Sequence, residues 1–207
     1  MKNSTVITIG RQYGSGGREI GKRIAEKLDI PYYDKELLEI SAKESGICKE
    51  FLEKHDEKAT NSFLYSLVMG SRMVGMSSVY GAELPLNQRI FLAQFETIER
   101  IASQGGCVIV GRCADYILRQ RKNVLKLFLY APIEDRVKRA VELYGHKADN
   151  AEKQVMQIDK QRESYYNYFT TQRWGDFRNY DVMLDTSRLG YDNAATLIEN
   201  YIALEKQ

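Results

Sequence analysis

The expected architecture follows from the residues Val6-Ile7-Thr8-Ile9-Gly10-Arg11-Gln12-Tyr13-Gly14-Ser15-Gly16-Gly17-Arg18-Glu19-Ile20-Gly21. The apolar, β-branched start predicts a strand that stops at Gly10, and a glycine-rich turn and a helix follow it. Glycines let the backbone turn tightly and bring N–H groups within reach of an anion, and the helix N-terminus adds its positive end at the same point. This is the layout of a phosphate-binding loop.

The lysine of the usual phosphate-loop pattern, G-x-x-x-x-G-K-[ST], is missing from this loop. If Gly16 is the last glycine of the pattern, Gly17 takes the place of the lysine and Arg18 that of the hydroxyl residue. The first seven positions of the pattern also match from Gly16 to Lys22. We reject that match, because Lys22 then lies inside a predicted helix over residues 18–28, whose apolar residues keep helical spacing.

Composition limits the classes of protein that this chain can be. A length of 207 residues suits one domain, with 43% hydrophobic and 28% charged residues as in ordinary soluble globular proteins. A net charge of +2 is too small to indicate a nucleic-acid polymer as partner, and no apolar run suggests a membrane span or signal peptide. We therefore expect a cytoplasmic protein. The three cysteines lack metal-ligand spacing and predict neither a disulfide nor a zinc site.

Four more apolar runs predict strands, at residues 31–34, 107–111, 124–131 and 180–186, with helical patterns between them. Continuous apolar runs suit strands covered on both faces, and alternation with helices indicates a parallel sheet. We therefore predict a three-layer α/β fold, in which a five-stranded parallel sheet has helices on both faces.

Two helical segments extend this fold. Residues 35–104 are too many for one crossover and predict a helical insertion, which includes a helix over residues 86–102. A second long helix, over residues 148–169, is placed to form a lid at about residues 145–170. Within the insertion, residues 62–80 are rich in Met, Ser and Gly, which fits either a loosely packed core helix or a flap that covers a substrate.

Single residues near the expected carboxyl edge of the sheet are candidates for a site. Arg112 follows the third strand, where ligands of open α/β folds bind, and it suits either a substrate phosphate or an ion pair with Asp115. Asp34 ends the second strand, where an acid either contacts substrate or caps the next helix.

Three-residue spacing puts two further pairs on single helix faces. Asp159 and Arg162 can form a surface salt bridge or contact one ligand together. Arg136 and Arg139 can form a solvated face or contact phosphate. The aromatic group near the end of the lid helix predicts core packing rather than a base-stacking surface. Its members are Tyr165, Tyr166, Tyr168, Phe169 and Trp174.

Taken together, these segments resemble the nucleoside monophosphate kinases over nearly the whole chain, specifically the cytidylate kinases and most closely the cytidylate kinase-like proteins. The resemblance implies a P-loop kinase fold with an acceptor-binding insertion and a lid. The motifs that carry it are Ile7-Thr8-Ile9 with Gly14-Ser15-Gly16, Gly111-Arg112, Ala131-Pro132-Ile133-Glu134-Asp135-Arg136, Asp159-x-x-Arg162 and Leu184-Asp185-Thr186-Ser187.

The resemblance also implies an activity, which is transfer of the γ-phosphoryl group of ATP to CMP or dCMP with Mg²⁺. Nucleotides would then be the partners of this chain. The implied phosphate cradle for ATP is Gly14, Ser15, Gly16 and Gly17, with Arg136 and Arg139 as further contacts to the donor phosphates. The implied acceptor site is Arg112, Asp159 and Arg162, with Asp34 and Arg89 as additional candidates.

Departures from the family pattern bear on catalysis. Cytidylate kinases have a lysine where this chain has Gly17, an aspartate in place of Cys113 and a further lid arginine in place of Val155. Arg18 is our candidate for the missing cation, unless its side chain points to solvent. Arg112 and Arg162 are the other candidate catalytic groups. Glu19 would have to bind Mg²⁺, directly or through water. Two alternatives therefore stay open: a nucleotide-binding protein that has lost transfer, and a kinase for a different small acceptor.

Overall fold

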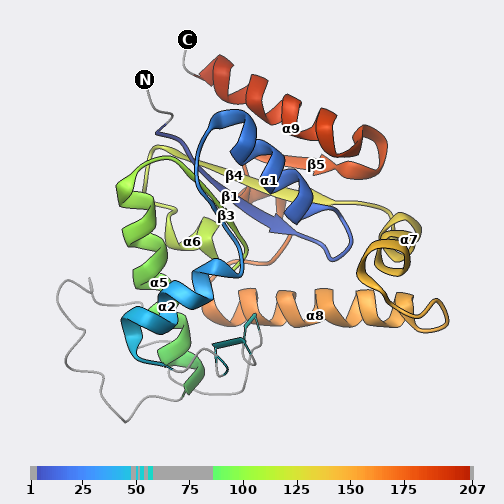
Figure 1. The fold of residues 1–207 in the computed structure, drawn as a ribbon, viewed down its shortest axis with the longest axis horizontal. Helices are drawn as coiled ribbons and strands as arrows, with labels where there is room; N and C mark the ends of the chain where they lie inside the picture. The colour runs from blue at the N-terminus through green and yellow to red at the C-terminus, as the bar shows by residue number, and fades with distance from the viewer. Residues whose placement is uncertain (1–3, 48–49, 51, 54–55, 58–85, 206–207) are drawn as a thin grey trace.

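The computed structural model describes residues 4–47, 50, 52–53, 56–57 and 86–205. Within them lies a five-stranded, all-parallel sheet of order β2-β3-β1-β4-β5, which confirms the predicted sheet (Figure 1). The central strand β1 pairs over its whole length with β4 and also pairs with β3. The strands are β1 Val6–Arg11, β2 Tyr32–Tyr33, β3 Cys107–Val110, β4 Val124–Tyr130 and β5 Val182–Asp185.

Helices cover both faces of this sheet, as predicted. On one face α1 and α9 pack against Ile7 and Ile9 of β1. On the other face α5, α6 and α8 pack around Val6 and Ile109. Figure 1 shows α1 and α9 on the side of the sheet opposite α8. The helices are α1 Gly17–Leu28, α2 Glu36–Ser45, α5 Leu86–Gln104, α6 Ala114–Ile117, α7 Ile133–Tyr144, α8 Ala151–Phe169 and α9 Thr186–Glu205, with a 3₁₀ turn η1 Phe177–Asn179.

Element boundaries differ from the predicted ones at the carboxyl edge of the sheet. β1 continues one residue past Gly10, because Arg11 still pairs with Leu129 of β4. β5 ends at Asp185, since Thr186 already begins α9. The sequence did not predict α6 and α9. These shifts place Arg11 on the sheet itself rather than in the glycine turn.

The predicted insertion is represented by α2 and α5, which pack against each other. Residues 62–80 lie outside the described residues, so the core-helix and flap interpretations both stay open. The single-domain organisation and the bounds of the insertion and lid stay predictions. In the part of the chain that the structure covers, no helix is both long and apolar enough to cross a membrane.

Aromatic side chains at the end of α8 lie in the core, which confirms their predicted role in packing. Phe169 stacks on Phe91 of α5 with ring centroids 4.3 Å apart, and Tyr165 packs beside both rings. Cys107 and Cys113 are buried free thiols, and Cys48 lies outside the described residues.

Asp115, in the short helix α6, makes stability depend on pH. Its carboxylate accepts a hydrogen bond of 2.6 Å from the Tyr166 hydroxyl, and burial raises its pKa to about 6. Because the unfolded chain ionises first, near pH 4, this group lowers the free energy of unfolding as pH rises from about 4 to 6.

We therefore expect Asp115→Asn to stabilise the protein at pH 7.5 relative to pH 4.5, by about 2 kcal/mol. Urea unfolding at both pH values measures this difference. The exposed Asp149→Asn is the matched control and should show no such gain. An effect of Asp115→Asn that is equal at the two pH values would contradict the prediction.

Candidate active site at the glycine loop

The glycine loop joins β1 to α1 in a conformation that only glycine adopts easily. Gly14 and Gly16 have φ of +79° and +82°. A Cβ at Gly14 would lie 2.6 Å from the carbonyl oxygen of Arg136, and one at Gly16 would overlap the ring of Tyr191. Both backbone strain and lack of space therefore require glycine here.

Side chains behind the loop bind its carbonyl groups. The amides at the start of α1 are left without such partners, since none of the described residues offers an acceptor to the N–H groups of Gly16, Gly17 and Arg18. Three amides at the start of α1 are a site for an anion. The donors to the loop carbonyls are Arg162 to Arg11 (3.2 Å), Arg136 to Tyr13 (3.3 Å), Arg139 to Gly14 (3.1 Å) and Thr186 to Ser15 (2.7 Å).

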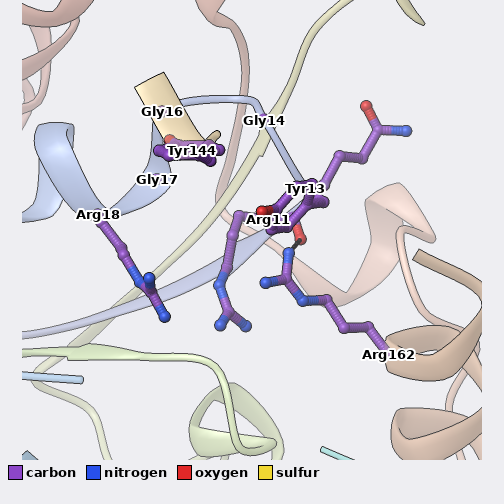
Figure 2. Close-up of a pocket in the computed structure, with 9 residues that line it drawn as sticks. Arg11, Tyr13, Gly14, Gly16, Gly17, Arg18, Tyr144 and Arg162 are labelled. Atoms are coloured by element: carbon purple, nitrogen blue, oxygen red, sulfur yellow. Dashed lines mark hydrogen bonds between the residues drawn. The ribbon is translucent and has the colours of Figure 1, made fainter. Parts of the chain in front are cut away.

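Beneath the loop is a pocket that the guanidinium groups of Arg11, Arg18 and Arg162 share (Figure 2). They come from the end of β1, the first turn of α1 and the middle of α8. Gln12, Tyr13 and Tyr144 complete the lining together with the loop glycines. No lysine in the described part of the chain lines this pocket, so arginines supply its positive charge.

Arg112 lies beside this pocket, at the end of β3 as predicted, with its side chain 1% exposed. Its guanidinium binds both carboxylate oxygens of Asp56, at 3.1 and 2.9 Å, and lies 3.4 Å from Asp34. The ion pair predicted as one alternative is therefore present, but with Asp56 and Asp34. Asp115 binds Tyr166 instead. The charge of Asp56 keeps the pKa of Arg112 above its usual value although burial opposes this.

Glu57 connects three arginines. Its carboxylate accepts two hydrogen bonds from Arg11, of 2.6 and 3.1 Å, and pairs with Arg162 Nε at 3.3 Å. It also accepts from the backbone N–H of Arg112 at 3.2 Å. Burial works against ionisation of Glu57, but the charges of Arg11 and Arg162 hold its pKa well below the usual range. Two guanidinium groups and one backbone N–H thus surround this half-buried carboxylate.

Sequence reasoning missed Arg11, Asp56 and Glu57. Arg11 stands inside the glycine pattern directly after the first strand, and this position at the carboxyl end of a strand was a signal for it. Asp56 and Glu57 lie in a polar segment of the insertion, where nothing in the local sequence distinguishes them from solvated acids.

Asp34 contacts Arg18 and Arg112 and is not the N-cap of α2. Its carboxylate accepts from Arg18 Nε at 2.6 Å, while the N-cap position of α2 falls on Lys35. Arg89 lies on α5 with an exposed side chain, and among the described residues it contacts none of the site. The acceptor-side candidates that the structure brings together are therefore Asp34, Arg112 and Arg162.

Asp159 and Arg162 lie near each other on α8 but bind different groups. Asp159 accepts from the backbone N–H of Tyr13 at 2.6 Å and pairs with Arg136. Arg162 pairs with Glu57 instead, and burial together with the charge of Arg11 lowers its pKa to about 10. Arg136 and Arg139 contact the loop from behind, and neither lines the pocket.

Glu19, one turn into α1, has one carboxylate oxygen free for a cation. Its Oε1 accepts from the Tyr144 hydroxyl at 3.1 Å, whereas Oε2 is buried and has no hydrogen-bond partner among the described residues. A single carboxylate beside phosphate oxygens and water suits Mg²⁺. The residues present therefore fit this ion. The described residues contain no cluster of three or more metal-binding side chains.

The chain is similar in sequence and in fold to known proteins. Curated relatives include cytidylate kinases of Methanocaldococcus jannaschii, 24% identical over 95% of this chain and 97% of that protein, and of Methanopyrus kandleri, 24% identical over 95% and 92%. An uncharacterized protein from Eubacterium ventriosum has a solved structure similar to this one, with TM-score 0.70, 28% identity and coverage of 96% and 98%.

A shikimate kinase from Bacteroides thetaiotaomicron shares the fold, with TM-score 0.56, 12% identity and coverage of 96% and 98%. The model of the cytidylate kinase-like family matches residues 6–188, which include the glycine loop, Arg112 and α8. The chain therefore belongs to the cytidylate kinase-like family.

Proposed function

We propose that this protein transfers the γ-phosphoryl group of ATP to CMP, dCMP or a similar small phosphorylated acceptor. The observation that carries the proposal is the arrangement of Arg11, Arg112 and Arg162 around one half-buried carboxylate, that of Glu57, beside the unpartnered amides at the start of α1. Two adjoining anion sites of this kind suit two nucleotides whose phosphates meet.

Under this proposal each side of the site has its own residues. The amides of the loop from Gly14 through Ser15 and Gly16 to Gly17 bind the donor phosphates, and Arg136 and Arg139 hold the loop in shape. Glu19 would hold Mg²⁺, which when bound neutralises charge on the donor phosphates. Arg112, Arg162 and Asp34 bind the acceptor, whose phosphate takes the place of Asp56 and Glu57 on the arginines. Arg89 and Asp159 stay further acceptor candidates.

The chemistry favours a phosphate over a hydroxyl as the attacking group. An acceptor phosphate oxygen forms the new bond to the γ-phosphorus, while the bond to the bridging oxygen breaks and leaves its electron pair on ADP. A phosphate oxygen carries no proton that a base must remove, whereas a hydroxyl does. Among the described residues, Asp34 and Asp159 stay paired under this proposal, with Arg18 and Arg136, and so are not free to act as such a base.

A coupled assay of ADP release with ATP and Mg²⁺ tests the proposal. We expect ADP release that depends on the acceptor, first with CMP and dCMP, and that exceeds the release in a control without acceptor. A panel of other nucleoside monophosphates identifies the base preference. ADP release only with an acceptor that lacks phosphate would replace the proposal with a kinase for a different acceptor.

A second candidate is a nucleotide-binding protein without transfer, which Gly17 in place of the lysine favours. Calorimetry of ATP binding, together with the ADP-release assay, separates this candidate from the first. Binding of ATP with no transfer to any acceptor would support this candidate and exclude the enzyme.

A further inference from the structure

We propose that Arg11 supplies, from the end of β1, the positive charge that a phosphate loop normally receives from a lysine at the start of the helix. This inference rests on the proposed function, because it assigns the cation that contacts the donor phosphates. It also explains why position 17 is a glycine.

Arg11 occupies the space that a side chain at position 17 would need. The backbone of Gly17 is not in the left-handed region, so conformation does not exclude a side chain there. Space does exclude it, because a Cβ on Gly17 would lie 2.9 Å from Cγ and 3.0 Å from Cβ of Arg11. These atoms are the stem of the arginine and cannot swing away as its tip could. An arginine at 11 and a lysine at 17 are therefore mutually exclusive.

The sheet directs Arg11 towards the loop. Side chains two residues apart on a strand point to the same face, so Arg11 shares the face of Ile7 and Ile9, which α1 covers. Its guanidinium then lines the pocket beneath the glycine loop (Figure 2). At the far end, Gly111 leaves room for Nη1, because a Cβ at that glycine would collide with it. Two glycines thus accommodate one arginine.

Arg11 also has the charge that the role demands. The side chain is buried, and burial alone would lower its pKa, but the carboxylate of Glu57 raises it above the usual value. Glu57 offers two oxygens to the fork of guanidinium donors, in the manner of a phosphate group. We infer that Glu57 holds Arg11 in place until the γ-phosphoryl group binds.

Arg18 is less suited to this role. Its Nε pairs with Asp34 at 2.6 Å, on the acceptor side of the pocket, and its side chain is 46% exposed. The geometry assigns Arg18 to the orientation of Asp34 and leaves the loop position to Arg11.

The test moves the positive charge from position 11 to position 17. Arg11→Gly removes both stem atoms, and we expect a fall in kcat/KM for ATP of about 10²–10³-fold. Gly17→Lys alone should have an equally low kcat/KM for ATP, because the stem of the new lysine collides with Arg11. Arg11→Gly/Gly17→Lys should recover at least about tenfold over Arg11→Gly, since the lysine then has both space and target. A double variant no better than Arg11→Gly would contradict the proposal.

Calorimetry gives a readout that does not require turnover. In Arg11→Gly the ratio of ATP to ADP affinity should fall at least about fivefold, because the cation facing the γ-phosphoryl group is lost. If Glu57 without its partner unfolds this variant, Arg11→Gly/Glu57→Gln removes that charge and serves for the same measurement. A lost preference for ATP in Arg18→Ala but not in Arg11→Gly would give the role to Arg18.

The same data separate failure of this inference from failure of the proposed function. A wild type that binds ATP but transfers to no acceptor would overturn the function, and the affinity ratio would still test Arg11. A wild type that turns over, with an Arg11→Gly variant of equal kcat, KM and affinity ratio, would overturn the role of Arg11 alone.

Discussion

Replacing Arg112 with methionine is expected to lower the free energy of unfolding by about 3–5 kcal/mol and to reduce transfer to a phosphorylated acceptor at least ~10³-fold. Methionine has similar length but no charge. It would leave Asp56 without its bidentate partner and Asp34 with only Arg18, in a place where Arg112 itself is 1% exposed. Removing one member of a buried ion pair is costly because the other charge stays buried.

Two variants separate the stability effect from the catalytic one. Arg112→Met/Asp56→Asn removes the stranded charge, so we expect it to regain a large part of the lost stability but none of the lost turnover. Arg112→Lys keeps the charge and loses the fork of donors, and should raise KM for the acceptor more than KM for ATP. Urea unfolding and steady-state kinetics measure both quantities. Normal turnover of the double variant would show that Arg112 does not bind the acceptor.

The sequence predicted the sheet and the position of the loop because both depend on local patterns. The apolar run from Val6 to Ile9 is buried on both faces, and the glycines that follow must turn the chain. Arg112 could be placed for the same reason, since it directly follows a buried strand and the carboxyl ends of parallel strands meet at one edge.

The contacts of the site could not be predicted from local patterns. Glu57 is 46 residues from Arg11 and 55 from Arg112, and the packing of the insertion brings them together. The predicted fifth strand includes Thr186, which in the structure begins α9. Its helical pattern is interrupted at Gly190, whose φ of +70° and ψ of 174° break the helix.

Asp159 shows how a motif can identify a functional residue and leave its partner open. The spacing with Arg162 and the family resemblance place it on the acceptor side, whereas its carboxylate binds the glycine loop, 146 residues away, through Tyr13 N–H. Its second oxygen pairs with Arg136, which in turn donates to the carbonyl of Tyr13. One acid of α8 therefore fixes the shape of the loop.

Asp159→Ala is accordingly expected to weaken ATP binding at least ~10-fold and to lower the free energy of unfolding by about 2–4 kcal/mol. The buried Arg136 loses its acid and the Tyr13 amide its acceptor. Asp159→Asn keeps an acceptor for the Tyr13 amide, so its effects on ATP binding and on the free energy of unfolding should be intermediate. Asp192→Ala is the matched control, because it breaks an ion pair with Arg23 at a carboxylate that is 83% exposed, and we expect a change below about 0.5 kcal/mol.

Kinetics decide between the two roles of Asp159. An acid that shapes the glycine loop acts on the donor, so its loss should raise KM for ATP and leave KM for the acceptor within about threefold. An acid that binds the acceptor would give the opposite pattern. The loop role also requires Arg136→Met to reproduce the rise in KM for ATP, and the double variant with Asp159→Ala to add little to it, because both residues act through the same backbone segment at Tyr13.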